Sequence, residues 1–351
     1  MKKRISVIIP VYNKENYILS CLDSVTASAF DGLEIICTDD GSTDSSLEIL
    51  NEYKAKDSRI KVIALEHKCA AAARNAGLDA AEGEYIHFLD ADDQLSETDA
   101  YERLYRAAAE YSADICECLY TNIDAATGGI HSEPGYFRRK GTGPYLPTMD
   151  TDAESLIRSH IIPWNKLIRR AFLLENGIRF EELSCAEDRP FYYELIYKSK
   201  KTVRITDRLI IHRVNIASSL DGSDIRFRDY DVEFRTFESI WRTAEKAPEY
   251  QKRMILDSCI GDSMYYLRKA AGTTYEAKMK AQAYEYWKDW LPLLGDRLFE
   301  QDWCLQYLEI VSALHPQEYE AYIRRKNSLP MKCARRLWKL QRIIYRYLGW
   351  R

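Results

Sequence analysis

The sequence predicts an α/β fold, a mostly parallel sheet with helices on both faces, followed by an all-helical C-terminal region. Three observations lead to this prediction. Short apolar stretches alternate with longer amphipathic ones over the first 120 residues, two of the apolar stretches run directly into acidic turns, and glycine and proline become scarce after about residue 221. The chain has 351 residues, of which 46% are hydrophobic, so it can bury a large core.

The apolar stretches of the first 120 residues have the length and composition of strands. We expect strands at "ISVIIPVY", "LEIICTDD", "IKVIAL", "EYIHFLD" and "ADICECLY", and helices at 15–29, from Asp44 onward, at 70–81 and at 97–111. Strands that alternate with helices of this length indicate a parallel, helix-covered sheet. Ligands of such sheets bind beyond the carboxyl ends of the strands, so the residues that follow the strands are site candidates.

The composition changes twice after residue 120. Residues 127–151 are rich in Gly, Pro and Tyr, which is typical of a long surface loop that lines a binding site. The stretch "IPWNKLIRRAFLLENGIRF" then returns to ordered structure, with a helix that Gly177 ends. Helical spacing dominates after about 221, so we expect two domains, residues 1–220 and residues 221–351.

Composition also excludes several classes of protein. The apolar part of "MKKRISVIIPVYN" is short and holds Pro10, which favours a first core strand over a secretion signal, and no run is long enough for a membrane span. Nine scattered cysteines without a CxxC pair argue against a zinc site or a disulfide framework and favour reduced thiols in the cytoplasm. Ten basic and no acidic residues follow Glu320, which leaves −14 for the rest of the chain, an unfavourable charge for binding nucleic acid.

Two acidic turns follow expected strands. Asp39 and Asp40 precede Gly41, which permits a tight turn, and "LDADD" places three carboxylates at the end of another strand. A well-capped helix start would explain the first turn, and a solvated turn would explain the second. Two such turns at matched strand ends favour instead a site for Mg²⁺, which binds one or two carboxylates together with substrate phosphates.

Arg74 is the candidate cation near those phosphates or near the base. We expect it at a helix start, where "RNAG" opens, and the alternative is a surface salt bridge.

Six motifs in order, "SVIIPVYN", "DDGSTD", "AARNAG", "FLDADD", "WNKLIRR" and "AEDRPF", resemble glycosyltransferase family 2, the inverting nucleotide-sugar enzymes of GT-A fold, of the bacterial surface-polysaccharide type. The resemblance covers roughly residues 4–220. It implies a nucleotide-sugar donor, by family habit a UDP-sugar, and Mn²⁺ or Mg²⁺ as cofactor.

The resemblance also implies roles for single residues. Those expected to bind the nucleotide-sugar are Pro10, Val11, Tyr12, Asp39, Asp40, Arg74, Asp90, Ala91, Trp164 and Lys166. Asp92, with Asp90 and His212, is expected at the metal, whereas Asp93 is expected to be a solvated neighbour. In "AEDRPF", Asp188 corresponds to the general base and Glu187 supports acceptor binding, while Arg213 beside His212 reaches toward metal or diphosphate.

The expected chemistry needs two separate sets of carboxylates. An acceptor hydroxyl has a high pKa, so a carboxylate must take its proton as the new bond forms. A metal at the diphosphate stabilises the charge of the leaving group. Base and leaving group then lie on opposite faces of the sugar, and the displacement inverts the anomeric centre.

The last residues, 331–351, predict a basic amphipathic helix. One face of it carries Cys333, Leu337, Leu340, Ile344, Tyr347 and Leu348, and the opposite face carries Lys332, Arg335, Arg336, Lys339, Arg342 and Arg346. Such a helix is typical of a segment that lies on an anionic membrane surface, here the inner face of the plasma membrane. The alternative is that its apolar face packs on protein.

Three functions remain open at this point. The leading one is transfer of a sugar from a nucleotide donor to a hydroxyl of a surface glycan or a lipid-linked oligosaccharide. The second is a teichoic-acid or protein glycosyltransferase, and the third is a non-catalytic scaffold that binds nucleotide-sugars. Asp92 and Asp188 argue against the scaffold because both motif carboxylates are intact. Acceptor choice is expected to reside in residues 127–165 and in the helical region.

Overall fold

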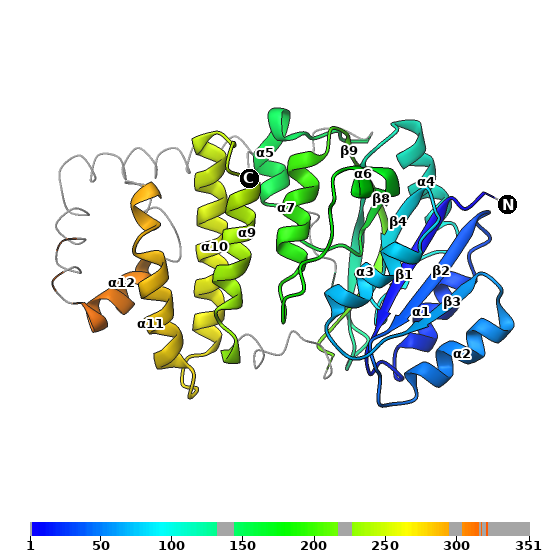
Figure 1. Cartoon of the computed structure of the whole chain (residues 1–351), viewed down its shortest axis with the longest axis horizontal. Helices are drawn as coiled ribbons and strands as arrows, with labels where there is room; N and C mark the ends of the chain where they lie inside the picture. The colour runs from blue at the N-terminus through cyan, green and yellow to red at the C-terminus, as the bar shows by residue number, and fades with distance from the viewer. Residues whose placement is uncertain are drawn as a thin grey trace. The chain divides into compact units, whose positions relative to one another are not determined.

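The computed structural model describes residues 2–131, 144–216, 227–294 and 304–315, together with residues 317 and 321 (Figure 1). The chain divides into two units. The first comprises Met1–Gly222 and Glu238–Lys246, and the second comprises Ser223–Phe237 and Ala247–Arg351.

The first unit is built on one sheet. Its strands lie in the order β3 (Ile60–Ala64), β2 (Leu33–Asp39), β1 (Ile5–Val11), β4 (Tyr85–Phe88), β8 (Lys166–Arg169), β6 (Ile115–Asp124), β9 (Thr202–Val214) and β5 (Gln94–Leu95), with β7 (Ile130–His131) beside β6. β1 to β4 run parallel to one another. β8 is antiparallel to both β4 and β6, and β9 is parallel to β6, so six of these nine strands share one direction. The prediction of a mostly parallel sheet is confirmed.

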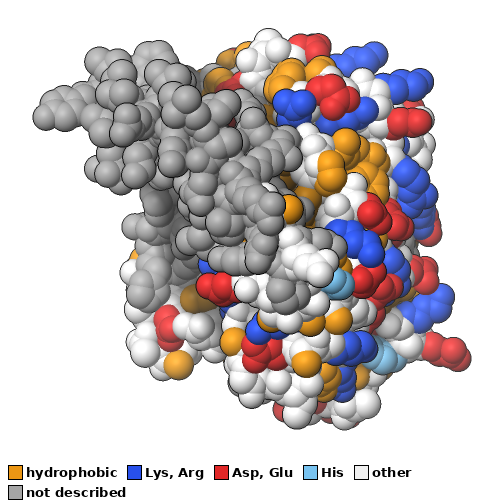
Figure 2. Space-filling view, turned by 90° about the vertical axis from the view of Figure 1, so that its left-hand side faces the viewer, with side chains coloured by type: hydrophobic (Ala, Val, Ile, Leu, Met, Phe, Trp, Pro, Cys, Tyr) orange, Lys and Arg blue, Asp and Glu red, His pale blue; other side chains and the backbone are white. Residues whose placement is uncertain are grey.

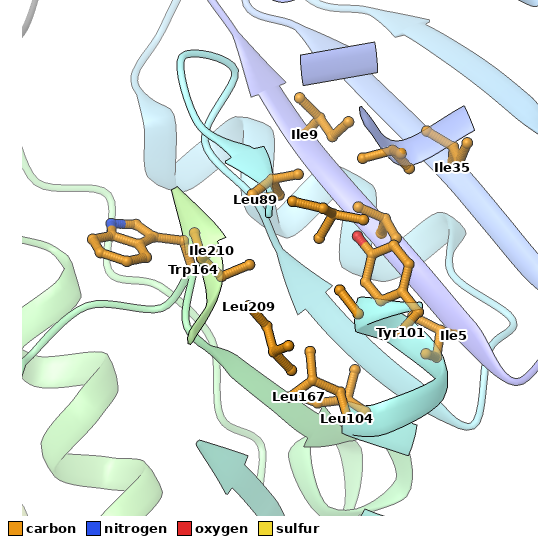
Figure 3. Packing of buried hydrophobic residues seen from close by; sticks show 14 of the residues in the cluster. Ile5, Ile9, Ile35, Leu89, Tyr101, Leu104, Trp164, Leu167, Leu209 and Ile210 are labelled. Carbon is orange, nitrogen blue, oxygen red and sulfur yellow. The ribbon is translucent and has the colours of Figure 1, made fainter. Parts of the chain in front are cut away.

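Helices cover both faces of the sheet, because successive strand residues point to opposite sides. Ile5, Val7 and Ile9 of β1 pack with residues of α1 (Ile18–Thr26) and α4 (Ala100–Glu110) in one core, part of which Figure 3 shows. Ile8, between them, faces a second core that includes residues of α3 (Ala70–Ala80), α6 (Arg170–Glu175) and α7 (Asp188–Lys198). α2 (Ser46–Lys56) and α5 (Met149–Ile157) complete the helices of the first unit.

The register of the sheet brings several strand ends to one rim. Val11 of β1 lies opposite Asp39 of β2, and Ile8 lies opposite Phe88 of β4. The backbone N–H of Asp40 donates to Val11 O (2.8 Å), and that of Leu65 donates to Asp39 O (2.8 Å). The turns that follow β1, β2, β3 and β4 therefore begin side by side.

α3 lies unusually close to the sheet. A Cβ atom added at Gly77 would come within 2.3 Å of Ile8 Cγ2 on β1, so only glycine permits this approach. The close packing carries Arg74, one helical turn earlier, to the same rim.

In the second half of the sheet, sequence reasoning predicted β6 but missed β8 and β9. Residues 166–169 form β8, and 202–214 form the long strand β9, in which hydrophobic alternation is interrupted by charged residues. The pairing of β6 with β9 contains two register shifts, which also disturb the alternation. The helix expected after "WNKL" is α6, and Gly177 follows it with φ of +62°, as predicted. Residues 132–143 of the expected long loop lie outside the described residues.

The described part of the second unit is helical. Its helices are α9 (Val232–Thr243), the last part of which belongs to the first unit, and α10 (Glu249–Lys269), α11 (Glu276–Trp287) and α12 (Cys304–Leu314). Trp287 is fully buried, and its indole N–H donates to Ser263 Oγ (3.0 Å). Tyr230 donates to Ser263 O (2.7 Å), so the polar groups of Trp287, Tyr230 and Ser263 pair with one another. The predicted basic helix 331–351 lies outside the described residues.

Three general features concern the helices, the cysteines and the surface charge of the described residues. None of the helices within the described ranges has both the length and the apolar composition to cross a bilayer. The eight cysteines within these ranges are free thiols. On the part of the surface visible in Figure 2, acidic and basic side chains are interspersed rather than segregated.

His87 of β4 makes stability depend on pH. It is fully buried, its Nε2–H donates to Trp164 O (2.7 Å), and its Nδ1 accepts from the Tyr101 hydroxyl (3.1 Å). Burial lowers the pKa of His87 from 6.5 to about 4. Between these values the unfolded chain binds a proton that the folded chain does not, so the free energy of unfolding falls as pH falls, by on the order of 3 kcal/mol.

We expect His87→Gln to lose this part of the pH dependence. Urea unfolding between pH 6.5 and 4 measures it for both chains. Equal slopes in the two chains would contradict the assignment.

Candidate active site

The acidic turn that follows β4 forms the centre of the site. The backbone N–H of Asp93 donates to Asp90 O (3.0 Å) and closes the turn, with Ala91 buried inside it. Asp90, Asp92 and Asp93 can each offer one oxygen within 4.8 Å of the others. Asp90 and Asp92 are partly exposed, whereas Asp93 is fully buried. The expectation that Asp93 is a solvated neighbour is therefore wrong.

The end of β9 holds Asp93 in place. His212 Nδ1 lies 2.9 Å from one carboxylate oxygen and 3.1 Å from the other, and the backbone N–H of Arg213 donates at 3.1 Å. Burial, opposed by the hydrogen bond from His212, raises the pKa of Asp93 to about 7. Burial lowers the pKa of His212, but Asp93, together with the charges of Asp90 and Asp92, outweighs it and raises the value.

Lys14, just after β1, contacts the same turn. Its ammonium lies 2.6 Å from Asp92 Oδ2, and both side chains are largely buried. The guanidinium of Arg213 donates to the backbone oxygen of Asp92 (2.8 Å) from the other side. Cations from two different strand ends thus surround Asp92.

Arg74 connects the acidic turn to a second pair of carboxylates. Its Nη2 donates to Asp90 Oδ1 (2.9 Å), and its Nη1 donates to Glu187 Oε1 (2.7 Å) and lies 3.3 Å from Asp188 Oδ1. The expectation that Arg74 lies at a helix start is wrong, because it lies inside α3. The alternative of a surface salt bridge does not hold either, because the side chain is only 5% exposed. Burial opposes the shift, but Asp188, Asp90 and Glu187 raise the pKa of Arg74.

Glu187 and Asp188 lie where α7 begins. Glu187 is the N-cap and Asp188 is the first helical residue, where the partial positive charge of the helix end stabilises a carboxylate. Ala186, just before them, has φ of +63°, a left-handed conformation that costs energy for a residue other than glycine. This strained turn directs both carboxylates to Arg74.

The turns after β1, β2 and β3 form the other end of the rim. Tyr12 is 41% exposed, and its ring stacks on that of His67 (centroids 4.1 Å apart, planes 15° apart). His67 Nδ1 lies 3.0 Å from Asp40 Oδ2, and Asp40 Oδ1 accepts from the N–H of Lys68 (2.9 Å). Gly41 has φ of +73°, and a Cβ there would come within 2.9 Å of His67 N. Glycine is therefore required for the two turns to meet.

Asp39, Pro10 and Val11 lie beneath this surface. Asp39 is buried, its Oδ2 accepts from the N–H of Ser42 (3.1 Å), and its Oδ1 has no hydrogen-bond partner among the described residues. Val11 is buried and Pro10 is partly buried.

Trp164 stacks on His212 (centroids 4.5 Å apart, planes 18° apart). Trp164 is buried, and its backbone oxygen accepts the hydrogen bond from His87 described above. The structure thus brings His212 of β9 to Asp93, and Trp164 packs on the ring of His212.

Lys166 has different surroundings. It is fully buried, and its ammonium contacts His160 O (3.0 Å), Ile162 O (2.7 Å) and Glu117 Oε1 (3.3 Å). Glu117 also accepts from Arg204 Nε (2.7 Å), and although burial opposes it, these two cations lower the pKa of Glu117 to about 2. This network joins β6, β8 and β9. The ammonium of Lys166 is directed into it and contacts buried groups of the chain.

Sequence reasoning missed Lys14 and His67. Both follow expected strands, β1 and β3, so position at a strand end was the available signal. Their partners, Asp92 and Asp40, become visible only once the strand order is known.

Comparison with known proteins now identifies the class. Residues 6–175 match the model of the glycosyl transferase family 2. The chain is 30% identical over 218 residues to the glycosyltransferase GlyG of Streptococcus pneumoniae, covering 61% of this chain and 71% of that protein. The chain therefore belongs to glycosyl transferase family 2, and the predictions of the family and of a glycosyltransferase enzyme are confirmed.

Other relatives are longer. GlyA of Streptococcus pneumoniae is 34% identical over 224 residues, 61% of this chain, but the chain spans only 31% of that protein. A poly(ribitol-phosphate) beta-glucosyltransferase of Bacillus spizizenii is 36% identical over 203 residues, 56% of this chain and 30% of that protein.

A crystal structure of S. aureus TarS 1-349 has a similar fold. It matches with a TM-score of 0.65 and 23% identity, over 84% of this chain and 82% of that one. A structure of the same protein in complex with UDP matches with a TM-score of 0.57 and 23% identity, over 84% and 80%. These likenesses confirm the predicted fold class.

Removal of the Arg74 guanidinium should strongly destabilise the fold. In Arg74→Gln, the carboxylates of Asp90, Glu187 and Asp188 lose the cation that they share. Loss of such a partner typically lowers the free energy of unfolding by about 3–5 kcal/mol. Arg179→Gln is the matched control, since it breaks an exposed pair with Asp79 and should cost less than about 1 kcal/mol. Chemical denaturation measures both variants. Equal decreases in the free energy of unfolding of the two variants would show that Arg74 does not stabilise the site.

Proposed function

We propose that this chain is an inverting glycosyltransferase that moves a sugar from a nucleotide donor, a UDP-sugar, to a hydroxyl of a surface-glycan or lipid-linked acceptor. The observation that carries the proposal is the position of Arg74. It contacts Asp90 in the acidic turn and also Asp188, 114 positions away in the sequence. Carboxylates of two different motifs, "FLDADD" and "AEDRPF", thus contact the same guanidinium.

The nucleotide end of the proposed site is the surface of Tyr12, Asp40 and His67. The stacked Tyr12 ring is exposed, so it offers a flat apolar face to a base. Asp40 is buried beside this ring, with its two oxygens contacting His67 and the N–H of Lys68, and it is the proposed acceptor for the N–H of a base. Pro10, Val11 and Asp39 support this surface from below, and Arg74 and Ala91 line its boundary with the acidic turn. Lys166 is not retained as a ligand-binding residue because its contacts are internal.

The acidic turn fits a divalent cation. The clustered oxygens of the turn are hard ligands, which suit Mg²⁺ or Mn²⁺, and two of the carboxylates are partly exposed. Asp92 and Asp90 would hold the ion, with His212 beside them. The ion, when bound, stabilises charge on the diphosphate as it leaves.

Asp188 is the proposed base. Its carboxylate oxygen takes the proton of the acceptor hydroxyl. At the same time the hydroxyl oxygen attacks the anomeric carbon, and the bond from that carbon to the diphosphate breaks. Arg74 and the start of α7 both stabilise negative charge on Asp188. Glu187, on the same guanidinium, orients the acceptor. One displacement without a protein nucleophile inverts the anomeric centre.

Replacement of the base should slow turnover strongly but spare donor binding. We expect Asp188→Asn to lower the rate of sugar transfer by about 10²–10⁴-fold, because the proton acceptor is lost. Asp92→Asn should lower both the rate and the binding of the donor with Mn²⁺. Release of UDP over a panel of UDP-sugars measures turnover and also identifies the donor.

Asp99→Asn is the matched control, since Asp99 is an exposed residue at the start of α4 and should leave turnover unchanged. A chain in which Asp92→Asn and Asp188→Asn change nothing would fit the scaffold alternative instead.

The acceptor class has one alternative. The likeness to a poly(ribitol-phosphate) beta-glucosyltransferase, which covers 56% of this chain, favours a teichoic-acid-type acceptor as the second candidate. A protein acceptor is the remaining alternative. Transfer to a polyol-phosphate polymer, a lipid-linked oligosaccharide and a peptide, with one donor, separates the three.

We further propose that residues 1–220 form the transferase domain and that residues 221–351 form a helical domain ending in a membrane-binding segment. The sequence 331–351 predicts basic and apolar faces on one helix, which suits an anionic lipid surface and a lipid-linked acceptor. The enzyme would then act at the inner face of the plasma membrane.

A chain that ends at Pro330 should bind anionic vesicles more weakly than the full chain, because the seven basic residues that follow Pro330 are lost. Co-sedimentation with phosphatidylglycerol vesicles measures this, and phosphatidylcholine vesicles are the control. Equal partitioning of the two chains would favour packing of the tail on protein.

A further inference from the structure

A side chain of α3 holds the backbone of the segment between α6 and α7. Residues 178–183 of this segment have no regular secondary structure, so their buried backbone groups need partners elsewhere. Asn75 Nδ2 donates to Phe180 O (2.8 Å), and Asn75 Oδ1 accepts from the N–H of Phe180 (3.1 Å). Phe180 is buried. One amide side chain therefore satisfies both backbone groups of one buried residue.

The position of Asn75 is unfavourable for helix formation. Asparagine is a poor residue inside a helix, because its side chain competes with the backbone for hydrogen bonds. Asn75 nevertheless lies inside α3, next to Arg74, and both polar atoms of its amide bond to a distant segment. The function proposed above assigns no role to Asn75. Its contacts indicate that a residue costly for the local helix serves a tertiary purpose.

The ring of Phe180 connects the acidic turn to the start of α7. It stacks on Phe191 in the first turn of α7 (centroids 3.8 Å apart, planes 12° apart). Phe88, the last residue of β4 before the acidic turn, meets the same ring at its edge (centroids 5.0 Å apart, planes 85° apart). The guanidinium carbon of Arg74 lies 5.1 Å from the ring centroid. Phe180 thus contacts the element before each carboxylate group or after it, and also their shared cation.

The carboxylates of Glu187 and Asp188 lie on a segment that is fixed at both ends. Phe180 precedes them and Phe191 follows them, and the two rings stack on each other. Ala186 lies between these two rings in the sequence and has φ of +63°. Such a strained conformation persists only where surrounding contacts hold it. The hydrogen bonds of Asn75 secure the first of these two ends.

We propose that Asn75 is a positioning residue for the transfer reaction. It fixes the backbone of Phe180, and the Phe180 ring then fixes Arg74 and the first turn of α7. The carboxylate of Asp188 thereby keeps its place relative to the acidic turn. The inference rests on the proposed function, because it takes Asp188 as the base. It deepens that function by assigning the placement of the base to a residue that acts through another.

Amide hydrogen exchange tests the contact on the unmodified chain. A backbone N–H held by a buried hydrogen bond exchanges slowly, because the segment must open before water reaches it. We expect the amide of Phe180 to exchange far more slowly than that of Glu182, which is exposed on the same segment. Mass spectrometry with fragmentation to single residues measures both amides in the full chain. Equal exchange at the two positions would overturn the proposal, and no variant has to fold for this result.

Kinetics separate positioning from structural support. Asn75→Ala should lower kcat by about 10–10²-fold, because a displacement of about 1 Å in a reacting group can cost that much. The KM for the donor and the Kd for UDP should stay unchanged, since Tyr12 and His67 form the other end of the rim. The UDP-sugar identified by the panel above is the substrate, and turnover is counted per molecule that binds UDP. A structural role alone would lower the number of such molecules and leave kcat per molecule unchanged, which would contradict the proposal.

Two further variants complete this experiment. Phe180→Leu keeps an apolar side chain and the backbone contacts to Asn75 but loses the ring stack, so it should also lower kcat without changing the Kd for UDP. It serves as the test where Asn75→Ala does not fold. Asn51→Ala is the matched control, because Asn51 is an exposed helical asparagine that bonds within its own helix α2, and kcat should stay unchanged.

Failure of this inference is distinguishable from failure of the proposed function. If Asp188→Asn lowers kcat but Asn75→Ala and Phe180→Leu do not, the positioning role is wrong and the proposed base stands. If Asp188→Asn leaves kcat unchanged, the proposed base is wrong, and the positioning role fails with it.

Discussion

The arrangement of the site depends on the guanidinium of Arg74. Asp90, Glu187 and Asp188 would repel one another if they were brought together without a cation, and burial would strengthen that repulsion. Arg74 offers each of them a hydrogen-bond donor at 2.7–3.3 Å from a position inside α3. Its five donors in a fixed plane suit contacts with several carboxylates better than a lysine ammonium would. The acidic turn and the start of α7 can therefore share one rim.

Packing of α3 makes this contact possible. Gly77 lets the helix approach β1 closely, and the approach sets how far the side chain of Arg74 must reach. The strained Ala186 on the other side turns the chain so that Glu187 and Asp188 face the guanidinium. Strain at that position is consistent with a site whose geometry is set by function rather than by local stability.

Buried ion pairs join β6, β8 and β9, and this pairing positions the end of β9 at the site. Glu117, Lys166 and Arg204 pair within the sheet, where an unpaired charge would be strongly unfavourable. Their pairing joins β6, β8 and β9. The end of β9 supplies His212 and Arg213 to the acidic turn, so the placement of that turn depends on strands that lie far from it in the sequence.

Much of this protein could be predicted from its sequence. The strands and helices of the first 120 residues, the two acidic turns and the termination of a helix at Gly177 follow from local patterns, because hydrophobic periodicity and turn residues act over short ranges. β8 and β9 could not be predicted in the same way. Their buried charges interrupt the alternation, and only pairing across the sheet makes those charges tolerable.

The sequence by itself determined which carboxylates could form a site, since a motif states residue types and their spacing. Tertiary structure decided what each one does. Asp92 and Asp93 are adjacent in the chain, yet one is partly exposed beside Lys14 and the other is buried against His212. The sequence indicates Arg74 as a candidate cation of the site, but only the close packing of α3 on β1 gives it three carboxylate partners. Exposure and charge pairing arise from contacts between distant segments, and local sequence does not encode those contacts.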